Sequence, residues 1–351
     1  MPELPDVPSE PASTLVVGVD GGGTKTDVCV ATAAGQVVGF ASGGEGNWEG
    51  AGLGAVGEVL KDLLTTALAQ AGSSRADMAA AAFCLAGVDW PSDRQRLEPH
   101  LAKLGLGGSQ VLTNDSFAAL RAGILGPAGC VSVAGTGGVA AGRNRNGETA
   151  RTMGAGIGEG SGALGLVAAA LDAIAAEHHL CGEATSLTAR FLDAVRIDTV
   201  PELFEGLTRG TSAIGGDLSV QVLAAARDGD PVACRISATC GAQHGRSTAG
   251  VARRLAMTEG PFEVVLAGGI HLNGEPTFRG AFTSALEAVC PSATVTVLHV
   301  PPAAGAAMLA LEAAGIDVSP IHEAITTETA AARSARPSAP ASDRPVRTSR
   351  P

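Results

Sequence analysis

The organisation of this chain follows from residues 16–30, VVGVDGGGTKTDVCV. An apolar run ends at Asp20, three glycines and Thr-Lys-Thr follow, and the next run is rich in β-branched residues. This pattern predicts a strand, a tight glycine turn and a returning strand. Glycine accepts positive φ and leaves no Cβ between backbone and ligand, so the turn offers N–H groups to an anion. A carboxylate at Asp20 suits a hydrated Mg²⁺, and we interpret the stretch as a nucleotide-phosphate hairpin.

Two better-known phosphate loops do not fit the sequence. In a Walker-A loop the last glycine is followed directly by Lys and then Ser or Thr, and the loop opens a helix. Here Thr24 separates Gly23 from Lys25, and a strand pattern follows. The residues 135–140, GTGGVA, fit a dinucleotide fingerprint nominally, but a short strand and an Asn-Gly turn follow in place of the required helix. An ordinary β-hairpin remains open for either loop taken alone, although three glycines exceed what a two-residue turn requires.

The composition of the chain excludes several classes of protein. The chain has 351 residues, 45% of them apolar, which is enough for two domains of ordinary size. A net charge of −11 and 3% aromatic residues argue against a general nucleic-acid surface or a stacking platform for single strands. No apolar run reaches the length of a membrane span, and the acidic, Pro-rich start resembles neither a signal nor a transit peptide. The seven cysteines are scattered without a C-x-x-C pair, so we expect a reduced, cytoplasmic enzyme.

Both ends of the chain lack the periodicity of folded segments. We expect disorder at residues 1–13 and again from 323 to 351, where Ala, Ser, Pro and Arg dominate after Ile325. Between these tails we expect an N-terminal domain at 14–126 and a C-terminal domain at 127–322. The last helix of the second segment, at 303–314, is one that can pack back on the first domain.

The organised part of the chain repeats itself. A strand, a glycine turn and a strand occur at 15–32 and again at 130–143, about 115 residues later, and each pair leads into mixed strands and helices. An internal duplication of an α/β unit explains this order. The further elements that we expect are strands at 37–42, 79–86, 110–113, 262–269 and 293–300, and helices at 52–71, 93–104, 116–125, 161–177, 186–195, 217–227, 231–257, 277–289 and 303–314.

Four segments in this order resemble the actin-like ATPase superfamily of sugar kinases, Hsp70 and actin. They are VDGGGTKT at 19–26, LTNDSFAAL at 112–120, VAGTGGVA at 133–140 and VLAGGIHLNG at 265–274. Within the superfamily, the chain is similar to the branch of N-acetylglucosamine kinases and BadF/BadG/BcrA/BcrD ATPases, over roughly residues 14–316. The resemblance implies duplicated actin-like (ribonuclease H-like) α/β domains that face an interdomain nucleotide cleft, with ATP and Mg²⁺ as cofactors.

The resemblance also implies roles for particular residues. Asp20 would position Mg²⁺, mostly through water, and Asp115 would act as the general base toward the attacking hydroxyl. The remaining cofactor-binding residues would be the β/γ-phosphate ligands Gly21, Gly22, Gly23, Thr24 and Lys25, the opposing hairpin Gly135, Thr136 and Gly137, and the adenosine-motif residues Gly268 and Gly269. Without the resemblance, Asp115 would be interpreted as a helix N-cap, for which Asn114 and Ser116 are equally suited.

Fewer residues indicate a sugar site than a nucleotide site, and they come from two loops. In GGEGNWEG, at 43–50, the resemblance implies that Asn47 reaches a hexose, and the ring of Trp48 can stack on a pyranose face or anchor the loop in the core. In CLAGVDWPSD, at 84–93, Asp89 is a second sugar candidate. Thr136 and Asp115 would also contact the substrate.

The chain departs from the family pattern after the second hairpin. Gly-Asp-Glu-Gly-Ser is typical of the family there, whereas this chain has Gly158 at the position of an aspartate that is associated with sugar binding. Glu159 either substitutes for it or only favours the helix N-terminus electrostatically. His244, His271 and His299 are isolated in sequence, and of these only His271, beside the adenosine motif, is expected near the cleft.

The sequence therefore predicts an ATP-dependent hexosamine kinase, with N-acetylglucosamine and its 6-hydroxyl as the expected acceptor. Its partners would be the small-molecule sugar and ATP, with no nucleic acid and no membrane, and a homodimer stays open. The alternative is a BadF/BadG-type activator ATPase that drives electrons into a reductase or dehydratase. That activity needs an iron–sulfur cluster with paired cysteines from each subunit, and the scattered cysteines count against it.

Overall fold

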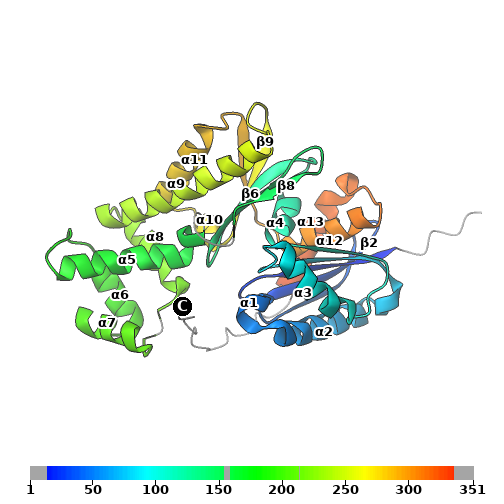
Figure 1. The fold of residues 1–351 in the computed structure, drawn as a ribbon, viewed down its shortest axis with the longest axis horizontal. Helices are drawn as coiled ribbons and strands as arrows, with labels where there is room; N and C mark the ends of the chain where they lie inside the picture. The colour runs from blue at the N-terminus through cyan, green and yellow to red at the C-terminus, as the bar shows by residue number, and fades with distance from the viewer. Residues whose placement is uncertain (1–13, 154–158, 213, 336–351) are drawn as a thin grey trace, which may run out of the picture. The chain divides into compact units, whose positions relative to one another are not determined.

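The computed structural model describes residues 14–153, 159–212 and 214–335. These residues form two compact units, which we call unit 1 (14–125 and 300–335) and unit 2 (126–299). Each unit is built on a five-stranded mixed sheet. Helices pack against each sheet, as the ribbon in Figure 1 shows. None of the described helices is long and apolar enough to cross a membrane.

The sheet of unit 1 has the strand order β3-β2-β1-β4-β5. Its first three strands form an antiparallel meander, and β4 and β5 run parallel to β1. The strands are β1 (Leu15–Gly21), β2 (Thr26–Thr32), β3 (Val37–Gly43), β4 (Met78–Leu85) and β5 (Ser109–Thr113).

Helices cover both faces of this sheet, because alternate residues of each buried strand point to opposite sides. Val17 and Val19 on β1 pack in one apolar cluster with α2 and α3, whereas Val16 packs in another with α12. Between them, Gly18 lets α12 approach closely, since a Cβ there would lie 2.1 Å from the Ala307 nitrogen. The helices of unit 1 are α1 (Trp48–Ala51), α2 (Leu53–Gln70), α3 (Pro91–Ala102), α4 (Ser116–Gly123), α12 (Pro302–Ala313) and α13 (His322–Ser334).

Helix α13 corrects the expected disorder from residue 323. The segment is helical to Ser334 and buries Ile325, Thr326 and Thr329 against unit 1. The sequence offers one large apolar residue here, which is why composition alone indicated a tail. Three buried residues on one side of an alanine-rich helix nevertheless suffice for docking, since alanine is the best helix former.

The sheet of unit 2 repeats the order of unit 1. Its order is β8-β7-β6-β9-β10, with β6, β7 and β8 antiparallel and β9 and β10 parallel to β6. In both units the first strand is therefore central, flanked by its hairpin partner and by the fourth strand, which confirms the predicted duplication. The strands are β6 (Gly129–Ala134), β7 (Gly138–Arg143), β8 (Thr149–Arg151), β9 (Phe262–Ala267) and β10 (Ala293–Val297).

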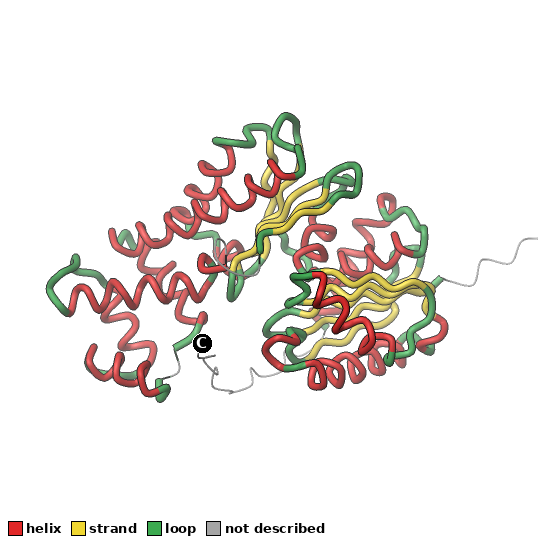
Figure 2. Tube along the Cα trace, viewed as in Figure 1, coloured by secondary structure: helices red, strands yellow, loops and turns green. Residues whose placement is uncertain are grey.

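Unit 2 differs from unit 1 in the helices between its third and fourth strands. Helices α9 and α11 pack against each other and form an apolar cluster with strand residues such as Cys130 and Val264, while α5 to α8 gather around a second cluster that includes Phe191 (Figure 2). Of the helices in unit 2, α7 and α10 were not predicted. The helices are α5 (Ala163–His178), α6 (Leu187–Val195), α7 (Val200–Arg209), α8 (Ser219–Arg227), α9 (Pro231–Arg254), α10 (Gly269–Asn273) and α11 (Pro276–Glu287). Short 3₁₀ turns occur at Arg75–Asp77 (η1), Glu159–Ser161 (η2), Gly216–Leu218 (η3) and Ser319–Ile321 (η4).

Candidate active site

The candidate residues of unit 1 share one edge of its sheet. Strands β1, β4 and β5 are parallel, and Asp20 on β1, Cys84 on β4 and Thr113 on β5 lie in register. Asp89 follows the end of β4 and Asp115 follows the end of β5. Ligands of open α/β sheets bind outside the carboxyl ends of the strands, and this edge is therefore the candidate site of unit 1.

The first glycine hairpin closes as the sequence predicts. The Gly22 N–H donates to the Lys25 carbonyl at 2.9 Å, and Gly23 and Thr24 are exposed at the tip. None of the three glycines has a positive φ, so their expected backbone freedom is not what the turn uses. At Gly21 the lack of a side chain matters instead, because a Cβ there would lie 2.6 Å from the Leu85 side chain.

Negative charge accumulates around Asp20. Burial raises the pKa of its carboxyl well above the usual range, and the carboxylates of Asp115 and Asp27 raise it further. Lys25 and Arg333 act on that pKa in the opposite direction, but they do not offset the rise. A carboxylate held next to other carboxylates favours a bound cation, and carboxylate oxygens are the ligands of Mg²⁺. Asp20, with Asp115 beside it, is therefore the place in unit 1 where the residues present could hold a Mg²⁺ ion.

The capping role that the sequence left open for Asp115 belongs to its neighbour. The Asp115 side chain accepts no capping hydrogen bond from α4. Asn114, which is buried, accepts from the Ser116 N–H at 3.1 Å and from the Ser116 hydroxyl at 2.6 Å. Asn114, and not the half-buried Asp115, therefore supplies the side-chain cap at the start of α4.

Asn114 also connects two candidate carboxylates. Its Nδ2 donates to Asp89 Oδ1 at 3.1 Å, and the Asp89 backbone N–H donates to Asp93 Oδ2 at 2.9 Å. The structure therefore brings Asp89 next to the segment that carries Asp115. Sequence reasoning considered Asn114 only as a possible cap, because its partner lies 25 residues away.

Asn47 and Trp48 follow β3 and open α1. The Asn47 Oδ1 caps this helix by accepting from the Glu49 N–H at 3.0 Å. The Trp48 indole donates to the Gly87 carbonyl at 2.7 Å, and the Arg96 guanidinium carbon lies 5.8 Å from the centre of the indole ring. Trp48 also packs against the unit 1 core, so the anchoring role that the sequence left open is present.

In unit 2, the second hairpin and the adenosine motif touch each other. The Gly135 N–H donates to the Gly137 carbonyl at 3.0 Å and leaves Thr136 exposed at the tip. Gly268 has a φ of 91°, and a Cβ there would lie 2.4 Å from the Ala134 carbonyl oxygen. Only glycine combines this conformation with so close an approach. Gly269 is exposed, and nothing lies within 4 Å of the Cβ that it lacks.

The N-terminus of α5 supports the same hairpin. The Ala163 N–H donates to the Gly135 carbonyl at 2.8 Å and the Leu164 N–H donates to the Thr136 carbonyl at 3.1 Å. Glu159 begins the 3₁₀ turn η2 ahead of this helix. The position of Gly158, where the sequence departs from the family pattern, lies outside the described residues.

Sequence reasoning missed a buried polar cluster in unit 2. The Ser132 hydroxyl on β6 lies 3.1 Å from His244 Nδ1 on α9 and 3.0 Å from His271 Nε2 on α10. All three side chains are buried, and His244 Nε2 lies 3.2 Å from the Ser161 carbonyl oxygen. Burial lowers the pKa of His244 to about 4 and lowers that of His271 well below its usual value. The cluster fastens β6 to α10, and His271 is therefore a buried brace rather than a ligand at a cleft.

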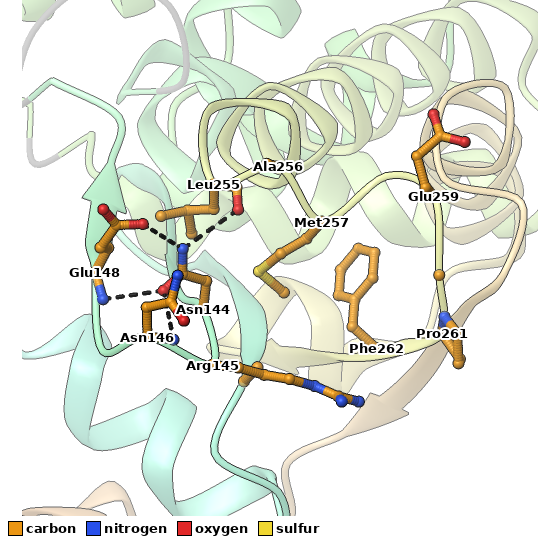
Figure 3. A pocket seen from close by; sticks show the side chains of 12 residues that line it. Asn144, Arg145, Asn146, Glu148, Leu255, Ala256, Met257, Glu259, Pro261 and Phe262 are labelled. Atoms are coloured by element: carbon orange, nitrogen blue, oxygen red, sulfur yellow. Dashed lines mark hydrogen bonds between the residues drawn. The ribbon is translucent and has the colours of Figure 1, made fainter.

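A surface pocket of about 490 Å³ lies at the opposite end of the unit 2 sheet (Figure 3). It is lined by residues such as Arg145, Met257 and Phe262, near the amino ends of the parallel strands β6 and β9. Asn144 braces its wall by donating to Glu148 Oε2 at 2.6 Å and to the Leu255 carbonyl at 3.4 Å. The hairpin and Gly268 follow the carboxyl ends of β6 and β9, so this pocket is separate from the candidate site.

The chain is similar in sequence to known proteins over most of its length. The sequence profile of the BadF/BadG/BcrA/BcrD ATPase family matches residues 17–310. The N-acetylmuramic acid/N-acetylglucosamine kinase of Clostridium acetobutylicum is 29% identical over 259 residues, which cover 73% of this chain and 85% of the relative.

Solved structures show the same fold. A Chromobacterium violaceum protein provisionally named N-acetylglucosamine kinase superposes with a TM-score of 0.67 at 23% identity, covering 85% of this chain and 99% of that one. A ROK family glucokinase from Streptomyces griseus, in complex with glucose and AMPPNP, superposes with a TM-score of 0.55 at 18% identity and the same coverage. The predicted class of duplicated actin-like α/β domains is thereby confirmed.

Proposed function

Because the chain belongs to the BadF/BadG/BcrA/BcrD ATPase family, we propose that it is an ATP-dependent kinase that phosphorylates a hexosamine. The similarity to the kinase of Clostridium acetobutylicum, which extends over most of both chains, supports this substrate class. N-acetylglucosamine is the acceptor that we propose, with transfer to its 6-hydroxyl. The observation that carries the proposal is the arrangement of Asp20 and Asp115 beside the first glycine hairpin.

We infer that the first hairpin receives the terminal phosphates of ATP. Gly23 and Thr24 are exposed at its tip, and Lys25, which follows them in sequence, has a partly exposed side chain. Asp20 is the residue that would hold Mg²⁺ here, and the ion would supply positive charge against the negative charge of the phosphates. Asp20 would hold this ion through water, and its own negative charge would then be compensated.

Asp115 is the proposed general base. It would accept the proton of the attacking sugar hydroxyl, or fix the orientation of that hydroxyl, next to the Asp20 site. Its side chain is not engaged in capping α4, since Asn114 supplies that cap. Such a base typically contributes about 10²–10⁴-fold to turnover, and positioning and electrostatics contribute the rest.

The sugar is proposed to contact the loops after β3 and β4. Asn47 and Asp89 offer an amide and a carboxylate near this edge of the sheet, and hexose hydroxyls are recognised by such groups. Trp48 would act chiefly by holding the Asn47 loop against Gly87. Glu159 and Thr136, from unit 2, remain proposed substrate contacts.

The proposed role of unit 2 is to bind the rest of the nucleotide. Gly135, Thr136 and Gly137 would contact phosphates, while Gly268 and Gly269 would let the backbone approach the adenosine. The contact between Gly268 and the end of β6 supports a single nucleotide surface made of both motifs.

The proposal is tested by measuring ADP release with ATP and Mg²⁺ against a panel of sugars. The panel contains N-acetylglucosamine, N-acetylmuramic acid, glucosamine, N-acetylmannosamine, glucose and a sample without sugar. We expect turnover that depends on an N-acetylated hexosamine. The 6-deoxy analogue of the best acceptor should bind but not accept phosphate, and phosphorylation of that analogue would refute the assignment of the 6-hydroxyl.

Sugar-independent ADP release would instead favour the activator ATPase alternative. That activity requires exposed cysteines that two subunits can share. Cys181 is exposed and Cys234 is half-buried, while the other five cysteines are buried. A redox partner should then be sought by following ATP-dependent electron transfer.

A further inference from the structure

Helix α13 lies beyond residue 310, where the match to the family profile ends. It is nevertheless firmly docked on unit 1. The Val37 N–H on β3 donates to Glu328 Oε2 at 2.7 Å, and Ile325 is fully buried in the cluster that covers one face of the sheet. The Thr329 hydroxyl, also fully buried, lies 3.9 Å from Cys29 Sγ on β2.

The last turn of α13 reaches the strand that leaves the first glycine hairpin. Arg333 Nε lies 3.9 Å from Asp27 Oδ2. Lys25 Nζ lies 2.6 Å from the same oxygen, and the Ser42 hydroxyl donates to Asp27 Oδ1 at 2.5 Å. The Asp27 side chain is fully buried, whereas the side chains of Lys25 and Arg333 are 39% and 44% exposed. One buried carboxylate therefore faces two partly exposed cations.

Asp27 also stands beside the candidate metal carboxylate. Asp20 and Asp27 are directly paired across β1 and β2, so their side chains lie on the same face of the sheet. A buried carboxylate without a counter-charge is costly. If Lys25 were the sole cation at Asp27, moving its ammonium toward a phosphate would carry that cost.

We propose that Arg333 is a positioning residue for nucleotide binding, which shares the Asp27 carboxylate with Lys25 and thereby leaves the Lys25 ammonium available to the terminal phosphates. This inference rests on the proposed function, since it requires that the chain binds ATP. When Lys25 turns to the nucleotide, Arg333 stays as the counter-charge of Asp27. The C-terminal helix thus tunes the affinity of the first hairpin for phosphate.

The test is calorimetric titration of the full chain with Mg²⁺-AMPPNP and, separately, with AMP, which lacks the β and γ phosphates. For Arg333→Ala we expect AMPPNP to bind about two- to fivefold more weakly, the range for a partly exposed charge pair, while AMP affinity stays unchanged. Arg333→Lys should restore AMPPNP affinity to within about twofold of wild type, because it keeps the charge. Arg235→Ala is the matched control, since Arg235 is 57% exposed and pairs with Glu183 in unit 2.

A double-mutant cycle separates positioning from direct contact. If Arg333 acts through Lys25, then Arg333→Ala should have no further effect in a Lys25→Ala background. An equal loss in both backgrounds would mean that Arg333 contacts the nucleotide itself, and would overturn the inference. Unchanged AMPPNP affinity in Arg333→Ala would also overturn it, with the proposed function intact. A folded wild-type chain that binds no AMPPNP would overturn both.

Discussion

The two units share a strand order but differ in charge at the carboxyl ends of their central strands. Unit 1 has Asp20 on β1, with the carboxylates of Asp27 and Asp115 near enough to raise the pKa of Asp20. At the corresponding end of β6, unit 2 has Ala134 in VAGTGG, where unit 1 has the aspartate of VDGGGT. The end of the central strand therefore carries an acidic residue in unit 1 and an uncharged residue in unit 2.

The polar groups behind the two hairpins differ in the same way. Asp27 in unit 1 faces two cations, whereas Ser132 in unit 2 lies between two imidazoles whose pKa values burial has lowered. A charged cluster suits a bound cation, which carboxylates attract, and a hydroxyl that gives up its proton to a carboxylate. A neutral cluster suits a rigid backbone surface for the nucleotide. Under the proposed function, the two copies of the fold would serve two different tasks.

The largest effect on turnover should come from Asp115→Asn, which removes the proposed general base from unit 1. We expect kcat to fall by about 10²–10⁴-fold while AMPPNP affinity changes little, because Asn keeps the size of the side chain. Steady-state kinetics with the best sugar and calorimetry with AMPPNP measure the two quantities. Asp62→Asn, at an exposed position on α2, is the matched control and should behave as wild type. A kcat above a tenth of the wild-type value would remove Asp115 as the base.

A smaller effect is expected at Asn47, where two roles must be separated. Asn47→Ala removes the cap of α1 and the carboxamide, whereas Asn47→Asp keeps a capping oxygen, removes the amide donor and adds a negative charge. If the amide binds sugar, both variants should raise the sugar KM about tenfold with little change in the KM for ATP. A raised sugar KM in Asn47→Ala alone would assign the residue to the cap and move the sugar elsewhere.

All strands except β8, and both hairpins, could be predicted because their signals are local. Apolar runs of β-branched residues bounded by glycine turns gave the strands of both units to within one or two residues in most cases. Helix α7 and helix α13 could not be predicted in this way. Each buries few large apolar residues, and α13 is stabilised by contacts with Val37 and Cys29, about 300 residues away in sequence.

The same limit applies to the candidate site. Asp20, Lys25 and Asp115 could be named from motifs, because each stands beside a glycine turn or a strand end. The Ser132 cluster could not, since its histidines lie 112 and 139 residues from Ser132 in sequence and are isolated in their own segments. Arg333 was hidden for the same reason. Local patterns indicate which residues carry chemistry, and long-range packing decides which residues hold them.

Two adjacent glycines of unit 2, Gly268 and Gly269, allow a second test of the comparison. Gly268→Ala should lower the free energy of unfolding by about 1–3 kcal/mol, because its positive φ and the Ala134 carbonyl leave no room for a Cβ. Gly269→Ala should leave stability within about 0.5 kcal/mol of wild type, since its Cβ would meet no atom within 4 Å. If the nucleotide approaches this backbone, Gly269→Ala should weaken AMPPNP binding several-fold in calorimetry. Wild-type affinity in Gly269→Ala would exclude that approach.

The smallest effect on turnover, but a clear one on stability, is expected from the buried histidines. Their folded pKa lies below that of the unfolded chain, so the stability of the neutral cluster is fully present above about pH 6.5. It should be lost as the pH falls toward about 4, the folded pKa of His244. Both tryptophans, Trp48 and Trp90, are in unit 1, so fluorescence does not report on this cluster, whereas amide hydrogen exchange in α9 does.

The variant His244→Gln tests the cause of this pH dependence. Gln keeps a polar side chain but has no proton to gain, so protection of the α9 amides should fall less steeply between pH 6.5 and pH 4 than in wild type. Turnover near pH 7 should change little, because the neutral cluster touches no proposed reacting atom. Equal slopes in both proteins would mean that carboxylates elsewhere govern the acid response. The difference in charge between unit 1 and unit 2 would then depend only on the residues of the two hairpins.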